Sequence, residues 1–285
     1  MSPTWHSADQ PALPPVRGFG WVRVGLRAAP LVIVIAAGLL VLLALRLIER
    51  PLCGLRRPVT PWITQAVCRI TLVILGLRFT VQGLPLKTAG AMVANHASWL
   101  DIFALNARMR VMFVAKSEVA GWAGIGWLAR ATGTVFIRRD RAEVAGQIAT
   151  FRAMLAAGHR LVFFPEGTST DGLQVLPFKP ALFATFLDPG LPPGLPAGLQ
   201  VQPVSVMYDA PAGTDPRFFG WWGAMDFAPH LLAVLARPGG GGVSLIYHPA
   251  VTVAQFQDRK GLALFCENAV RAGVSSLQPA APSAP

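Results

Sequence analysis

The first polar motif that could do chemistry is the segment Asn95–Asp101. It follows the apolar run Ala91–Ala94, which predicts a short buried strand. Ser98 stands three residues before Asp101, and apolar residues recur after it at helical spacing. We therefore predict a helix with Ser98 as its N-cap and Asp101 near its N3 position. His96 would lie in the turn before this helix, where its ring can meet the Asp101 carboxylate.

A histidine and an aspartate placed in this way could act as a general base pair. The carboxylate would accept a hydrogen bond from one ring nitrogen and leave the other nitrogen free to take a proton from an alcohol. This is the base and orienting half of a catalytic triad, without an enzyme nucleophile. The structural alternative is that Asp101 is a first-turn carboxylate favoured by the helix dipole and His96 a satisfied turn residue. The motif alone does not separate the two interpretations.

A second polar motif, Phe163–Ser169, overlaps the apolar run Leu161–Phe164. That run also predicts a buried strand, and the Pro and Gly of the motif predict a turn at its end. Together with two further segments, Gly133–Arg139 and Val201–Val206, the two motifs resemble the four signature blocks of the glycerolipid acyltransferase family, in the family's order. The resemblance covers about residues 65 to 210. The best-known members of that family make phosphatidic acid from lysophosphatidic acid.

The resemblance implies an activity and a set of site residues. It implies transfer of a fatty acyl group from acyl carrier protein or coenzyme A to the hydroxyl of a lysolipid, with His96 as the base and Asp101 orienting it. The acyl acceptor would contact Arg139, Glu166, Gly167, Thr168 and Ser169. Gly167 would let backbone approach the ligand closely, and a cap or salt bridge is the structural alternative for Glu166. We expect no metal and no bound cofactor, because the acyl thioester is a co-substrate.

One residue departs from the family pattern. Members that use phosphate-bearing acceptors usually have an arginine where this chain has Ser169. A guanidinium binds phosphate through paired hydrogen bonds, and a serine hydroxyl cannot replace its charge. We therefore expect an acceptor without a phosphomonoester, although Arg138 and Arg139 could compensate and leave lysophosphatidic acid as an alternative acceptor.

Two other segments point to a narrower branch of the family. Thr170–Gly172 and Arg217–Trp222 resemble the bacterial lyso-ornithine lipid acyltransferases, which esterify the 3-hydroxyl of an amide-linked fatty acid on ornithine. A non-catalytic lipid-binding membrane scaffold is the alternative from another class, and the intact pair of His96 and Asp101 argues against it. A hydrolase is a further alternative, but the chain lacks a Gly-x-Ser-x-Gly elbow.

Composition indicates a membrane surface. Of the 285 residues, 53% are hydrophobic and 14% charged, and the net charge is +11. A chain this basic and apolar fits an anionic membrane or an acidic acyl carrier. Nucleic acid is disfavoured because no basic run is interleaved with aromatic residues. The three cysteines are widely spaced and do not have metal-ligand spacing, so we interpret them as reduced packing residues.

The region before the catalytic blocks predicts an anchor. Ala28–Leu45 carries no charge, and at about 1.5 Å per residue it just spans a hydrocarbon core. We favour an uncleaved anchor, spanning or deeply embedded, over a signal peptide. The second apolar stretch, Trp62–Leu77, suits a helix at the membrane interface or one docked beneath the catalytic domain. We place the protein at the cell inner membrane with its catalytic domain on the cytoplasmic face. The predicted organisation is a disordered leader (1–20), a membrane-anchoring helical region (21–78), an acyltransferase domain (79–275) and a disordered tail (276–285).

From residue 79 the chain alternates apolar runs with helical patterns, which predicts an α/β fold with a mixed sheet flanked by helices. We predict strands at residues 79–83, 91–94, 111–115, 135–137, 161–164, 201–208 and 243–248. An amphipathic helix is predicted over 141–157, with His159 just past its end as a partner of the helix dipole. The aromatic cluster Phe218–Trp222 is either a lipid-facing patch or a loop folded onto the core.

Overall fold

The computed structural model describes residues 5, 10–122, 124–137, 144–187 and 198–277 and contains one mixed sheet. Its strand order is β1-β7-β6-β2-β5-β3-β4, and β8 pairs with β6. The strands are β1 (Arg78–Gln82), β2 (Gly90–Ala94), β3 (Met112–Lys116), β4 (Val135–Ile137), β5 (Arg160–Phe163), β6 (Gln200–Asp209), β7 (Gly242–Tyr247) and β8 (Val251–Thr252). The seven predicted strands are thereby confirmed with ends shifted by about one residue, and β8 was not predicted.

The centre of the sheet is parallel, and this arrangement positions the site. β2 pairs in parallel with β5 on one side and with β6 on the other, so that Ala91 faces both Leu161 and Val201. The carboxyl ends of these three strands therefore meet at one edge of the sheet. β7 runs antiparallel to β6, which makes the sheet mixed as predicted.

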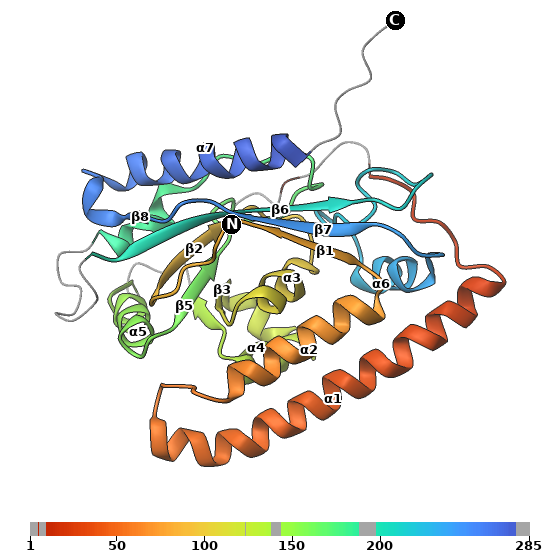
Figure 1. Cartoon of the computed structure of the whole chain (residues 1–285), viewed down its shortest axis with the longest axis horizontal. Coiled ribbons are helices and arrows are strands. Elements are labelled where there is room, and N and C mark those ends of the chain that lie inside the picture. Colours follow the sequence, from red (N-terminus) through yellow and green to blue (C-terminus); the bar gives the residue numbers. More distant parts are fainter. Residues whose placement is uncertain (1–4, 6–9, 123, 138–143, 188–197, 278–285) are drawn as a thin grey trace, which may run out of the picture.

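Helices cover both faces of the sheet (Figure 1). The helices are α1 (Phe19–Cys53), α2 (Thr60–Ile74), α3 (Asp101–Arg108), α4 (Ile125–Thr132), α5 (Val144–Ala156), α6 (Phe227–Ala236) and α7 (Arg259–Leu277), with shorter turns η1 (Ser117–Gly121), η3 (Pro180–Phe186) and η4 (Val253–Gln255). Side chains from α1, α2, α3 and α6 form one core cluster with the sheet, and those from α5, η3 and α7 form another. The core thus lies in two layers, as an α/β fold requires.

The long helix α1 lies along the catalytic domain. It contacts α6 near its start and α2 and α4 further along, on the side of the sheet away from α7 (Figure 1). Arg23 Nε donates to Ala236 O at 2.7 Å, and Arg27 Nη1 donates to Leu235 O at 2.8 Å and to Arg237 O at 2.7 Å. These bonds satisfy carbonyls at the end of α6, where cations are favoured.

The outer side of α1 is apolar and exposed. Its most apolar 18-residue window has a mean hydropathy of 3.0 and is only 11% buried. A core helix of a soluble protein would bury such a surface, so α1 indicates membrane association. Within the described part of the chain it is the one helix long and apolar enough to cross a bilayer. The second apolar stretch forms α2, which docks against α3 and α1.

Candidate active site

His96 and Asp101 meet in the turn after β2. His96 Nδ1 lies 2.7 Å from Asp101 Oδ2, and the His96 side chain is 22% exposed whereas that of Asp101 is fully buried. The ring of His96 stacks on Phe164, with centroids 4.2 Å apart and planes at 15°. The stacking and the hydrogen bond hold the ring with Nδ1 toward the protein. The predicted pair is therefore brought together, and Nε2 is the nitrogen that remains for other partners.

Asp101 is bound from several sides, which fixes its position. Its Oδ2 also accepts hydrogen bonds from the backbone N–H groups of Ala97 at 2.9 Å and Ser98 at 3.1 Å. The helix α3 itself begins at Asp101 with Leu100 as its N-cap, so the predicted N-cap role of Ser98 is wrong. Ser98 instead closes the preceding turn, because its hydroxyl accepts from Leu100 N at 3.3 Å. The turn before the helix thus wraps around the carboxylate.

Tyr208 is a site residue that the sequence analysis missed. Its hydroxyl donates to Asp101 Oδ1 at 2.7 Å from the carboxyl end of β6. Burial, and after it the charge of Asp101, raises the pKa of Tyr208 well above its usual value, so the hydroxyl stays protonated and able to donate. The clue in the sequence was the position of Tyr208 at the end of the predicted strand 201–208, which carries the fourth signature block.

Glu166 lies beneath the histidine turn. Its Oε1 accepts from His96 N at 3.1 Å and its Oε2 from Leu176 N at 3.4 Å, and the residue is 1% exposed. Burial raises the pKa of Glu166 to about 8, against the opposing effect of the two backbone hydrogen bonds. A carboxyl group in this place holds the backbone that carries His96.

The other predicted acceptor-binding residues lie beside it. Gly167 has a φ of 72°, a backbone conformation that favours glycine, and it turns the chain after β5. Thr168 and Ser169 are half-buried, and Thr168 Oγ1 accepts from Trp5 N at 3.3 Å. Arg139 lies outside the described residues.

The aromatic cluster Phe218–Trp222 folds onto the core, which is the second of its two predicted alternatives. Phe218, Phe219 and Trp222 are at most 5% exposed. Trp221 N donates to Ala97 O at 2.8 Å, so the segment also supports the histidine turn. Because these rings reach apolar partners inside the fold, membrane contact is not needed to bury them.

Nearby, a buried histidine has a structural role. Burial lowers the pKa of His230 to about 4, so its ring is neutral and Nδ1 can accept a hydrogen bond from Trp99 Nε1 at 3.0 Å. The described residues hold no group of three or more His, Cys, Asp or Glu side chains that could bind a metal ion. Cys53, Cys68 and Cys266 are free thiols.

Comparison with known proteins shows the family. The chain is 53% identical to the lyso-ornithine lipid O-acyltransferase of Rhodobacter capsulatus, over 95% of this chain and 97% of that protein. The sequence model of the family described as "Acyltransferase" matches residues 78–207. The chain belongs to the acyltransferase family. The assignment from four sequence blocks is thereby confirmed, and so is the prediction of an enzyme that transfers acyl groups.

Two further relatives extend the comparison. The acyltransferase is 35% identical to a lyso-ornithine lipid O-acyltransferase of Rhizobium meliloti, over 84% of this chain and 82% of that one. Among solved structures, the 1-acyl-sn-glycerophosphate (LPA) acyltransferase of Thermotoga maritima matches with a TM-score of 0.62 at 22% identity, covering 93% of this chain and 100% of that one. At this identity the likeness concerns the fold, and it confirms the predicted sheet flanked by helices.

Proposed function

We propose that this acyltransferase esterifies the hydroxyl of lyso-ornithine lipid to give ornithine lipid, with His96 as the general base and Asp101 as the residue that orients it. The observation that carries the proposal is the hydrogen bond of 2.7 Å between His96 Nδ1 and a buried Asp101. Asp101 accepts four hydrogen bonds in all, and besides His96 the donors are Ala97, Ser98 and Tyr208. A carboxylate held in this way keeps the imidazole in one tautomer with Nε2 unprotonated.

The proposed reaction is direct transfer. Nε2 of His96 takes the proton of the acceptor hydroxyl as the oxygen attacks the carbonyl carbon of an acyl thioester. Collapse of the tetrahedral intermediate forms the ester and breaks the carbon–sulfur bond, and the thiolate leaves with the proton that His96 returns. This scheme needs no acyl-enzyme, because the acceptor oxygen itself is the nucleophile.

Different features of the protein support the acceptor and the donor. The two relatives named as lyso-ornithine lipid O-acyltransferases match most of this chain, and Ser169 supplies no cation for a phosphomonoester. For the donor we propose acyl carrier protein, with acyl coenzyme A as the alternative, because a chain of net charge +11 favours docking of an acidic protein. We place the enzyme on the cytoplasmic face of the inner membrane, held by α1.

An acyl-transfer assay on purified enzyme in detergent tests the proposal. Labelled acyl carrier protein or acyl coenzyme A would be supplied with lyso-ornithine lipid and lysophosphatidic acid side by side. We expect ester formation on lyso-ornithine lipid that is lost in His96→Ala. Preference for lysophosphatidic acid would overturn the acceptor assignment, and full activity of His96→Ala would overturn the base assignment. Release of free fatty acid without acceptor-dependent product would indicate a hydrolase.

A further inference from the structure

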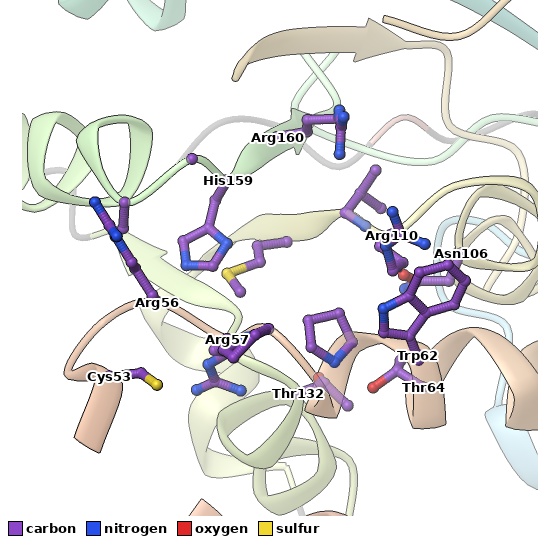
Figure 2. A pocket seen from close by; sticks show the side chains of 16 residues that line it. Cys53, Arg56, Arg57, Trp62, Thr64, Asn106, Arg110, Thr132, His159 and Arg160 are labelled. Atoms are coloured by element: carbon purple, nitrogen blue, oxygen red, sulfur yellow. Dashed lines mark hydrogen bonds between the residues drawn. The ribbon is translucent and has the colours of Figure 1, made fainter. Parts of the chain in front are cut away.

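A cavity of about 480 Å³ lies at the opposite end of the sheet from His96. It is lined by the connection between α1 and α2, the start of α2, the residues before and at the start of β3, the end of α4, and the turn that leads into β5. Figure 2 shows side chains from these separate segments pointing into one space. His96 and Glu166 follow the last residues of β2 and β5, whereas Arg160 is the first residue of β5. The four residues of β5 alone separate the two sites by about 13 Å.

The cavity is lined by basic side chains. Five of its side chains are basic, and none of its lining residues is acidic: Arg56, Arg57, Arg110, His159 and Arg160. His159 was predicted to act on the dipole of the helix before it, but its Nε2 donates to Leu55 O at 2.8 Å and its ring lines this cavity. The group comes from three segments that are far apart in the sequence, so the fold creates the cluster.

Three of the cavity arginines contact neutral groups, which leave their positive charge in place. Arg57 Nη1 donates to Ala131 O at 2.9 Å, and Arg160 Nε donates to Leu86 O at 2.9 Å. The guanidinium of Arg110 lies 3.6 Å from the centre of the Trp62 ring. Among the described residues, none of the four arginines forms an ion pair.

The carboxylate whose charge acts on Arg57 is already occupied. Glu49 accepts from Arg46 at 3.0 Å, from Thr60 Oγ1 at 2.6 Å and from Val59 N at 2.8 Å. Burial, and after it the charge of Arg46, lowers the pKa of Arg57 to about 10, and the opposing effect of Glu49 offsets only part of this. A bound anion would relieve this cost.

The surroundings of the cavity indicate where the anion comes from. Leu52, Leu55 and Trp62 are 78%, 54% and 55% exposed, and they lie on the same connection and helix ends as Arg56 and Arg57. The connection continues directly from α1, whose exposed side is apolar. Exposed apolar side chains next to arginines are typical of a surface that meets lipid headgroups, because the chains enter the interface while the cations bind phosphate.

We propose that this cavity binds the phosphate group of an anionic phospholipid such as phosphatidylglycerol. The arginines supply charge-assisted hydrogen bonds to the phosphate oxygens, and the exposed apolar residues lie against the acyl chains. The site is separate from the acyl-transfer chemistry, so its test measures binding.

The experiment uses the full chain in dodecylmaltoside micelles and isothermal titration calorimetry. Dioctanoylphosphatidylglycerol is the probe, dioctanoylphosphatidylcholine is the zwitterionic comparison, and glycerol 3-phosphate presents a phosphate without acyl chains. Arg56→Gln combined with Arg110→Gln removes two cavity charges. The matched control, Arg259→Gln combined with Lys260→Gln, removes two exposed charges at the start of α7, on the other face of the sheet.

We expect phosphatidylglycerol to bind the wild type and to bind the cavity variant about tenfold or more weakly, in line with the loss of charge-assisted hydrogen bonds. The control variant should bind as the wild type does. If the double variant has a lowered melting temperature, Arg56→Gln alone is used in its place, because this side chain is exposed and its replacement should not disturb the fold. We expect the single variant to weaken binding by a smaller factor. Equal weakening in the control variant, or unchanged binding in both variants, would overturn the proposal. Binding of glycerol 3-phosphate as tight as that of phosphatidylglycerol would overturn the lipid as the source of the phosphate.

Discussion

The two ends of the sheet handle charge in opposite ways. At the carboxyl end, Asp101 is buried and accepts hydrogen bonds from a ring, a phenol and two backbone groups. At the amino end, Arg56, Arg57, Arg110 and Arg160 line an open cavity, and none of them forms an ion pair among the described residues. The buried carboxylate therefore has its partners within the protein, whereas the four arginines have no ion-pair partner among the described residues.

This difference separates a site for chemistry from a site for binding. A general base works only if its orientation is set before the substrate arrives, and that requires partners within the protein. A binding site for an anion gains affinity from cations whose partner is the ligand. The comparison therefore predicts that variants at the carboxyl end change turnover or specificity, and that variants at the amino end change lipid binding.

The largest effect is expected at His96. His96→Ala should lower kcat by about 10²–10⁴-fold, because it removes the base. His96→Gln can still donate a hydrogen bond toward Asp101 but cannot take a proton, so it should be equally inactive. Acyl-transfer rates with saturating lysolipid measure both variants, and their melting temperatures control for the fold. A Gln variant that keeps most of the activity would mean that the pair of His96 and Asp101 is structural.

An arginine in place of Ser169 would add a phosphate-binding group to the active site at the carboxyl end of the sheet. Ser169→Arg should raise the ratio of kcat/KM for lysophosphatidic acid over that for lyso-ornithine lipid by about tenfold, because it adds one charge-assisted hydrogen bond. Ser169→Gln is the control of similar polarity without the charge. An unchanged ratio in the arginine variant would show that Ser169 does not meet the acceptor headgroup.

Tyr208 is a positioning residue, and a second buried tyrosine gives its control. Tyr208→Phe should lower kcat by about three- to tenfold with a smaller change in KM, since Asp101 loses one donor. Tyr247→Phe should leave kcat unchanged, because the Tyr247 hydroxyl is buried and has no hydrogen-bond partner in the described structure. Steady-state kinetics on both variants tests this, and equal losses in the two would contradict the role of Tyr208.

The smallest effect concerns the pH dependence of stability. The pKa of Glu166 is about 8 in the fold and near 4.5 as an ordinary carboxyl group. Between these pH values the unfolded chain loses a proton that the folded chain keeps, so the contribution of Glu166 to stability falls as the pH rises. Glu166→Gln carries no proton to lose and should have a melting temperature less dependent on pH between 5 and 8. If the melting temperatures of the two proteins change with pH by the same amount over this range, the raised pKa is contradicted.

The sequence predicted those parts of the molecule that depend on contiguous residues. The strands of the sheet and the contact of His96 with Asp101 follow from short patterns, because neighbours in the chain decide them. The start of α3 was placed too early, since Ser98 serves the turn that holds Asp101 and the helix begins later. The predicted helix over 141–157 is α5, described from Val144 to Ala156.

Features assembled from distant segments escaped the sequence analysis. The cavity joins Arg56, Arg110 and Arg160, which no local spacing connects. Tyr208 reaches Asp101 across 107 positions, through the parallel pairing of β2 with β6. The sequence left the burial of Phe218–Trp222 open as one of two alternatives, because it depends on α6 and on the turn after β2. Pattern and composition describe what a segment can bury, and tertiary contacts decide what it does bury.

The attachment of α1 to α6 has a kinetic consequence. Arg23 and Arg27 tie the first turns of the anchor to the end of α6, so the start of the anchor is held against the catalytic domain. With α1 in the bilayer, the enzyme meets its lysolipid by diffusion in two dimensions. Its rate then depends on the mole fraction of lysolipid in the surface, and adding inert lipid should slow the enzyme by dilution even when the bulk concentration of acceptor stays constant.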